Sequence, residues 1–188
     1  MLLSQGPLDI ARRFDGFNIN GFKFRTKGRE QGLKTQNSGV AMFANTKSSS
    51  IGEDGKLMSS DVLYHGRLVD IVELNYFGKL RVVMFKCEWV DPALKKGTKI
   101  DEFGITSVNF SRLVHTGTKE TDEPFILATN ARMVYYVDDP TDQGWSCVCH
   151  VKPRDLYDMG DESLMHSEKS VAENIPFASQ HLDDKAQY

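Results

Sequence analysis

Short stretches of alternating apolar and polar residues dominate this 188-residue chain. Residues 20–26 alternate phenylalanines with basic side chains after an Asn-Gly pair, which predicts a half-buried strand entered by a tight turn. Residues 38–45 predict a second strand. Residues 46–60 are rich in Ser and Gly and predict a mobile loop.

The densest apolar pattern follows this loop. Across residues 61–77 it predicts either two strands or one long strand bent at Gly66. The apolar side chains expected on one face occupy even positions: Val62, Tyr64, Leu68, Val72, Leu74 and Tyr76. A turn at residues 77–79 then predicts a hairpin with residues 79–91.

The second arm of this hairpin is apolar on both faces from residue 82 to 85, which indicates a central strand of a curled sheet or barrel. Its later part alternates, so that Cys87 shares a face with Val83, Phe85 and Trp89. Cys87 is therefore expected to be a small core residue without chemistry of its own.

The remaining elements are shorter. Strands are expected near residues 105–113 and 144–153. Residues 123–139 end in a strand-like run, with a helix as the alternative across residues 126–133. One short helical turn is expected at residues 153–160, with Gly160 as its stop.

Together these elements predict a mainly β protein, folded as a curled antiparallel sheet or a small SH3-like barrel. We expect an N-terminal extension at residues 1–16, a β-rich domain at 17–159 and an acidic, disordered tail at 160–188. The chain lacks the run of about 18 apolar residues that spans a bilayer. Its first residues are too short an apolar stretch for a signal peptide, so an intracellular location, nuclear or cytoplasmic and not secreted, is expected.

The net charge of −3 conceals an asymmetry between the two ends. Residues 11–47 carry a net charge of +6 and residues 155–188 a net charge of −6. The ends could attract each other, or the basic front could contact phosphates of nucleic acid without reading sequence. The basic residues nominated for that contact are Lys23, Arg25, Lys27, Arg29 and Lys34.

A zinc site is one interpretation of Cys147, Cys149 and His150, because thiolates and imidazoles are zinc ligands. In a strand, however, His150 faces away from both cysteines, and a fourth ligand is lacking. We therefore expect no metal and no cofactor. Three cysteines in an intracellular chain also argue against a disulfide framework.

Acidic pairs at residues 101–102, 122–123 and 138–139 raise the alternative of a metal-dependent nuclease. Each pair flanks an expected strand, where carboxylates usually sit in solvated turns, and no nucleophile or phosphate-loop motif accompanies them. A non-catalytic protein is the preferred interpretation. Aromatic rings expected on strands could form an interaction surface for a protein or for bases: Tyr64, Tyr76, Trp89 and Tyr135.

Several phrases of the chain, taken in order, carry a family resemblance. They are "NINGFKFRT", "KTQNSGV", "YHGRLVDIVELNYFGKLRVVMFKCEWVD", "DEFGITSVNFSRLVHTG", "DEPFILATNARMVYYVDDP" and "VKPRDLYDM". From about Gly16 to Met159 the chain resembles the uncharacterised domain near the C-terminus of proteins encoded by plant CACTA (En/Spm-like) DNA transposons. Asn130 and Met133 stand where that family often has glutamines, and Cys147 and Cys149 where it often has aliphatic residues.

The resemblance implies a plant source and a transposon or transposon-derived gene, with the transposase domain upstream and absent here. It transfers no catalytic residue. The first expectation is therefore a non-catalytic domain that binds a protein partner in a transposition or chromatin context. A sequence-nonspecific nucleic-acid-binding module is the second, and no membrane or small-molecule substrate is expected.

Overall fold

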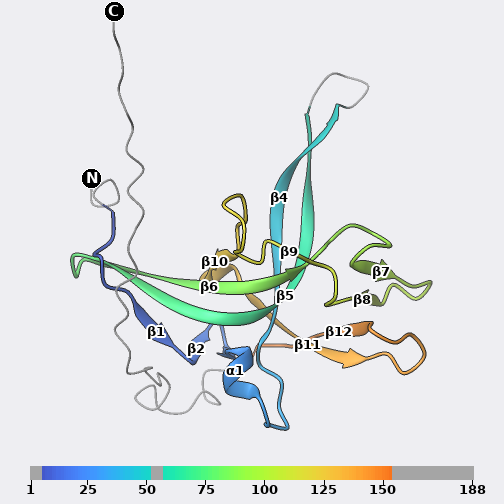
Figure 1. Ribbon diagram of the computed structural model, residues 1–188, viewed down its shortest axis with the longest axis horizontal. Helices are drawn as coiled ribbons and strands as arrows, with labels where there is room; N and C mark the ends of the chain where they lie inside the picture. The colour runs from blue at the N-terminus through green and yellow to red at the C-terminus, as the bar shows by residue number, and fades with distance from the viewer. Residues whose placement is uncertain (1–5, 52–56, 154–188) are drawn as a thin grey trace, which may run out of the picture.

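The computed structural model describes residues 6–51 and 57–153 of the chain. Nearly all of its regular elements are strands, as the alternation predicted (Figure 1). Two single turns of helix accompany them. In order, the elements are β1 (Arg12–Phe14), β2 (Gly16–Ile19), β3 (Phe22–Arg25), α1 (Lys27–Glu30), β4 (Gly39–Ile51), β5 (Leu57–Tyr76), β6 (Leu80–Val90), β7 (Thr98–Ile100), β8 (Thr106–Val108), β9 (Leu113–Val114), β10 (Phe125–Leu127), the 3₁₀ turn η2 (Ala128–Asn130), β11 (Arg132–Asp138) and β12 (Ser146–His150).

The main sheet is antiparallel and follows the order β10-β6-β5-β4-β11-β12-β8-β7, with β1 on β5 and β9 on β6. Long β5 and β6 curve together as a hairpin, and β7, β8, β11 and β12 gather at one end of it (Figure 1). Among the described residues the path ends at β10 and β7, so the curled sheet is a half-barrel. The expectation of a mainly β fold built on a curled antiparallel sheet is confirmed.

Two hydrophobic cores lie on opposite sides of this sheet. The larger core packs the β2–β3 hairpin onto the β5–β6 hairpin, where Phe24 meets Phe85 at a ring-centroid distance of 5.0 Å. The smaller core lies between β4, β6, β8, β11 and β12 and includes Val90 and Tyr136. Trp89 and Val90 enter different cores, so β6 is buried on both faces at these two residues. The sequence had predicted this two-sided burial earlier in the strand, at residues 82–85. Cys87 is 1% exposed in the larger core, which confirms its expected place.

The β5 strand is continuous, and its irregularity falls at Val69 rather than at Gly66. Leu68 pairs with Cys87 and Asp70 with Lys86, so Val69 is an extra residue in the β5–β6 ladder. Such a bulge reverses which positions face the core. Ile71 therefore joins Leu68 in the larger core, and the expectation that Val72, Leu74 and Tyr76 share the face of Leu68 is wrong.

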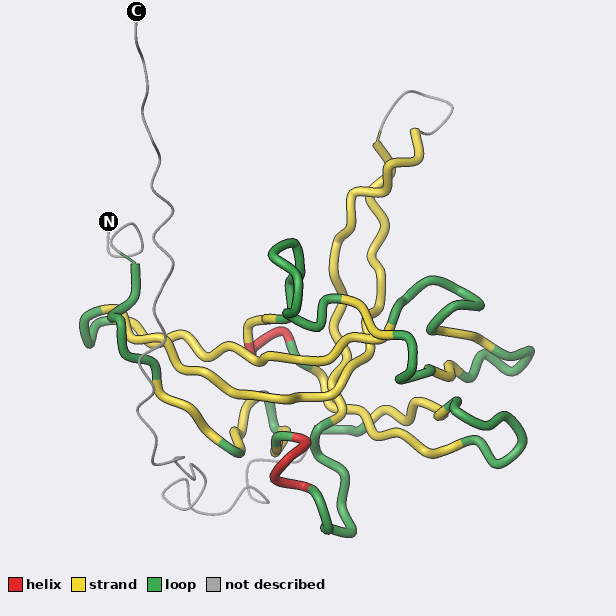
Figure 2. Tube along the Cα trace, in the orientation of Figure 1, coloured by secondary structure: helices red, strands yellow, loops and turns green. Residues whose placement is uncertain are grey.

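The expected loop at residues 46–60 is also corrected. Strand β4 runs to Ile51 and β5 starts at Leu57, so the two form a long hairpin arm that projects from the sheet (Figure 2). Serine-rich composition did not prevent pairing: Lys47 pairs with Ser59 and Ile51 with Leu57, with an irregular register between these two pairs. The expected helical turn at 153–160 lies outside the described residues.

The C-terminal elements are shorter than expected. A single strand at 105–113 is replaced by β8 and β9, since Asn109 accepts hydrogen bonds from the backbone and hydroxyl of Ser111 and turns the chain there. The possible helix at 126–133 is one 3₁₀ turn, η2, between β10 and β11. The strand-like run before residue 138 and the strand at 146–150 are present as β11 and β12.

Candidate anion-binding groove

A groove of about 450 Å³ opens where the β2–β3 turn, the loop before β4, β11 and the chain after β12 meet. It brings together segments that are more than 100 residues apart in the chain. The lining residues are Gly21, Phe22, Lys23, Lys34, Thr35, Gln36, Asn37, Met133, Tyr135, Val151 and Lys152.

The loop that bears Lys34 is held by side chains of the chain itself. The Glu30 carboxylate accepts hydrogen bonds from the Asn37 and Ser38 amides, at 2.7 and 2.9 Å, and from the Ser38 hydroxyl. The Gln36 side chain bonds both the amide and the carbonyl of Tyr136, at 2.7 and 3.1 Å. The loop is thus fastened to α1 on one side and to β11 on the other.

Lys23 is placed by strand alternation. Phe22 and Phe24 point into the larger core, so Lys23 between them points to solvent. The turn before them is Asn20–Gly21, and both residues have positive φ, 53° and 74°, as a tight hairpin of this kind requires. The Asn37 side chain donates to the Lys23 carbonyl at 2.9 Å and ties this hairpin to the Lys34 loop.

Lys152 completes the set of charges. The Val151 amide donates to the Met133 carbonyl, which extends the β11–β12 pairing and brings Lys152 to the groove. The lining contains three lysines and no acidic residue. Within residues 6–51 and 57–153, none of Lys23, Lys34 and Lys152 takes part in an ion pair. Among the residues that the structure describes, no carboxylate in the lining compensates these positive charges.

Tyr135 adds an exposed ring to this site. It lies on β11 directly opposite Cys149 of β12, and 41% of its surface is exposed. The neighbouring Cys149 thiol, and burial to a lesser degree, raise the pKa of the Tyr135 hydroxyl above its usual value. The hydroxyl therefore stays protonated at neutral pH.

The structure thus unites two of the five nominated basic residues with one of the four nominated aromatics. Arg25 is half-buried on β3, on the same side of the strand as Lys23 but outside the groove lining. Lys27 and Arg29 lie on α1, where Lys27 forms an ion pair with Glu88 at 2.9 Å. The sequence analysis did not nominate Lys152, because nothing in the residues around a single lysine after a strand indicates a binding site.

The other nominated rings are placed differently. Trp89 is 2% exposed and donates its indole N–H to the Pro124 carbonyl at 3.3 Å. A ligand cannot reach it, so its proposed part in a surface is corrected. Tyr64 packs edge-on against Trp89 and is half-buried, and Tyr76 is half-buried at the end of β5. An interaction role for these two tyrosines stays a prediction.

Each acidic pair contributes a carboxylate to the backbone of a turn. Asp101 accepts from the amides of Phe103 and Ile105, and Asp122 accepts from three successive amides that begin at Gly117. Asp139 accepts from Thr141, and these bonds lower the pKa of its carboxyl group. Among the described residues no three His, Cys, Asp or Glu side chains come together as metal ligands.

All three cysteines carry free thiols. Cys147 and Cys149 lie on the same face of the sheet as Tyr135 of β11 and are half-buried, more open than the sequence indicated. His150 lies one residue further along, opposite Val134. Burial, followed by the charge of Glu88, raises the pKa of the Cys87 thiol far above its usual range.

We expect Cys87 to resist alkylation in the folded protein because it is both buried and protonated. With iodoacetamide at pH 8, intact mass should show labels only on Cys147 and Cys149 in the native chain and a third label in urea. A Cys87→Ala variant should show the same native pattern. Native labelling of Cys87 as fast as Cys149 would contradict this placement.

His65 is a buried polar residue whose environment the sequence did not reveal. It is 3% exposed, and neither ring nitrogen has a hydrogen-bond partner among the described residues. Burial, with a further contribution from nearby His150, lowers its pKa from 6.5 to about 4. The ring is thus neutral at physiological pH and sensitive to acid.

No helix in the described part of the chain is long and apolar enough to cross a membrane. Residues 72–148 match a family model described as "Domain of unknown function (DUF4216)". No curated protein and no solved structure matches the chain. The matched segment runs from the second half of β5 into β12, so it contains Tyr135 but none of the three groove lysines. Over these residues the chain is similar to a family whose function is unknown.

Proposed function

We propose that the protein is a non-catalytic nucleic-acid-binding module that holds phosphate groups in the groove. The observation that supports this best is the convergence of Lys23, Lys34 and Lys152 from separate segments in a site without acidic lining. None of these lysines forms an ion pair within the described part of the chain. Lysine ammonium groups bind phosphates as point charges and read no base sequence. A site of this kind therefore binds without sequence preference.

The resemblance to the C-terminal domain of CACTA transposon proteins supports a setting for this activity. A plant transposon-derived protein works on DNA in the nucleus, where an accessory domain that holds nucleic acid would serve transposition or chromatin. The DUF4216 match is compatible with this setting but assigns no activity to it.

The proposal predicts binding that weakens steeply with salt. Three phosphate contacts on a single strand correspond to a slope of about −2 in a plot of log affinity against log salt concentration, and each lysine removed should reduce that slope by about 0.7. Fluorescence anisotropy with a labelled 12-nucleotide oligonucleotide between 50 and 200 mM KCl measures both quantities for Lys23→Ala, Lys34→Ala and Lys152→Ala.

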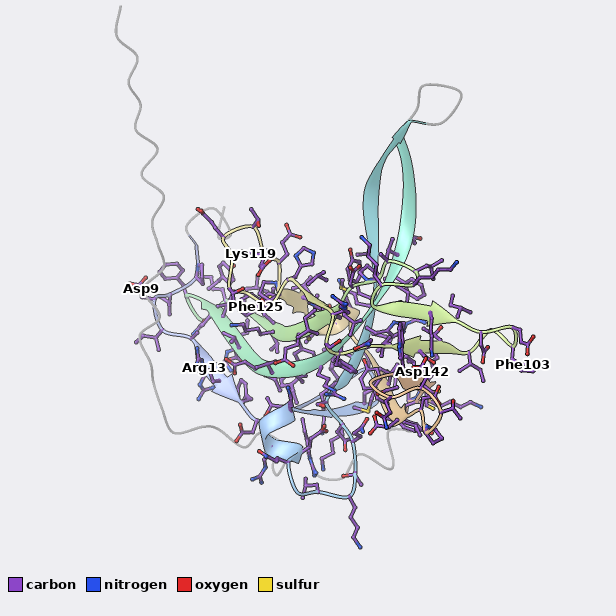
Figure 3. All side chains as sticks on the ribbon, turned by 45° about the vertical axis from the view of Figure 1, so that its right-hand side comes forward. Asp9, Arg13, Phe103, Lys119, Phe125 and Asp142 are labelled. Carbon is purple, nitrogen blue, oxygen red and sulfur yellow. The ribbon has the colours of Figure 1, made fainter. Side chains whose placement is uncertain are left out.

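A matched control is Lys119→Ala, an exposed lysine on the loop before β10 (Figure 3). Its removal changes the net charge equally but leaves the groove intact, so its slope should equal that of the unmodified chain. If the Lys119 variant loses as much affinity as the groove variants, the groove is not the binding site. If no oligonucleotide binds at 50 mM KCl, the proposed function is wrong.

Binding of a protein partner is the second candidate, and the β7–β8 hairpin favours it. Phe103 at its tip is 80% exposed, and Ile100 and Ile105 beside it are 58% and 48% exposed (Figure 3). Asp101 fixes this turn through its bonds to the Phe103 and Ile105 amides. An apolar tip fixed in this way suits an apolar pocket on a partner, and binding through such a contact would depend little on salt.

A further inference from the structure

The face of β11 and β12 that borders the groove is open to solvent. Tyr135 and Val137 alternate with buried Val134 and Tyr136, so both point to this face, where they are 41% and 49% exposed. Cys149 lies opposite Tyr135 on the same face. The exposed face of β11 and β12 thus continues from the groove, with Tyr135 next to the groove lysines and Val137 further away.

The β11–β12 ladder holds the backbone of Tyr135 in place, opposite Cys149 of the neighbouring strand. The next residue, Tyr136, is buried and donates its hydroxyl to the Gly66 carbonyl at 2.7 Å. Its backbone amide and carbonyl are both hydrogen-bonded to the Gln36 side chain. The strand that carries the Tyr135 ring is thus fixed, so a flat ligand that stacks on this ring does not have to order the backbone beneath it.

Three lysines beside an exposed ring match what a single strand of nucleic acid presents, since each of its nucleotides offers one phosphate and one unpaired base. We propose that the groove selects single-stranded nucleic acid by stacking one base on Tyr135, while Lys23, Lys34 and Lys152 hold the adjoining phosphates. The inference rests on the proposed function and adds the class of ligand.

A duplex fits this site less well. Its bases are paired and stacked inside the helix, so a base must be unstacked before it can reach the ring. A volume of about 450 Å³ lies in the range of small-ligand sites, which suits a nucleotide unit of a flexible strand. The stacking contact is tolerant of sequence, because every base has a flat face.

The test compares three labelled probes of equal length on the full 188-residue chain: dT12, a 12-nucleotide abasic strand and a 12-base-pair duplex. The abasic strand keeps the phosphates but has no base to stack. We expect dT12 to bind at least about fivefold tighter than the abasic strand. Tyr135→Ala should remove this difference and leave the abasic affinity unchanged, whereas Tyr135→Phe should keep the preference because it keeps the ring.

The outcomes separate this inference from the proposed function. All three probes could bind the chain, bind the groove-lysine variants more weakly, and bind the Tyr135→Ala variant as well as the unmodified chain. In that case the groove binds phosphate and the stacking inference is wrong. A duplex that binds tighter than dT12 also overturns it. If the groove-lysine variants bind every probe as tightly as the unmodified chain does, the proposed function itself is wrong. Circular dichroism of each variant verifies that a lost preference does not come from unfolding.

Discussion

A Gly39→Ala substitution is expected to lower the free energy of unfolding by about 3 kcal/mol or more. An added Cβ would collide with the Val134 carbonyl oxygen, would lie 2.9 Å from the Val134 carbonyl carbon, and would touch the Tyr136 ring at 3.1 Å. The first two are backbone atoms of β11, which cannot rotate away as a side chain can. The β4–β11 crossing, which adjoins both cores, would therefore have to open.

Urea unfolding followed by intrinsic fluorescence measures this loss. The matched control is Gly28→Ala on α1, where an added Cβ meets nothing within 4 Å. That variant should be neutral or more stable by up to about 1 kcal/mol, since alanine favours helix over glycine. Equal midpoints for the Gly39 variant and the unmodified chain would show that β4 and β11 are not in close contact at this point.

Acid should destabilise the protein through His65. Its pKa is 6.5 when unfolded and about 4 when folded, so between these values the unfolded chain binds the additional proton. Stability from this residue is therefore complete above pH 6.5 and falls as the pH drops toward 4. By linkage the loss at pH 4.5, relative to pH 7.5, is about 2.5 kcal/mol.

The contribution of His65 is isolated by comparison with a His65→Phe variant of similar shape, in which no group titrates at this position. Urea unfolding of both proteins at pH 7.5, 6, 5 and 4.5 should show the unmodified chain losing about 2.5 kcal/mol relative to the variant over this range, because only the unmodified chain has this titrating group. His150→Gln should leave most of the effect in place, since burial is the main cause of the shift. Parallel pH profiles would contradict the burial of an unpaired imidazole.

Strand identity could be predicted well because it depends on local alternation. The β5–β6 hairpin, its turn at residues 77–79 and the place of Cys87 in the core were all accessible from the pattern of side chains. The reversal of faces after Val69 was not, since a bulge depends on how two strands pair and leaves no mark on the composition of one strand. Likewise, Gly66 proved to be a packing residue, because a Cβ there would lie 2.7 Å from the Trp89 ring.

The candidate site was only partly predictable. Lys23, Lys34 and Tyr135 could be nominated singly from charge and ring type, but nothing in the chain linked them to each other or to Lys152. Lys27 has the same charge and lies nearby in the sequence, yet its ion pair with Glu88 satisfies it. Which cations remain unpaired is set by contacts between distant segments, which charge counts do not contain.

By itself the sequence determined that this chain builds an antiparallel β fold with an apolar interior, because period-two alternation and turn residues act between near neighbours. The tertiary structure alone decided that the sheet stays open, that two cores form, and that three lysines and a tyrosine share one groove. These features arise from pairing between strands far apart in the chain. Their energies depend on register, burial and partner, which no short stretch of residues specifies.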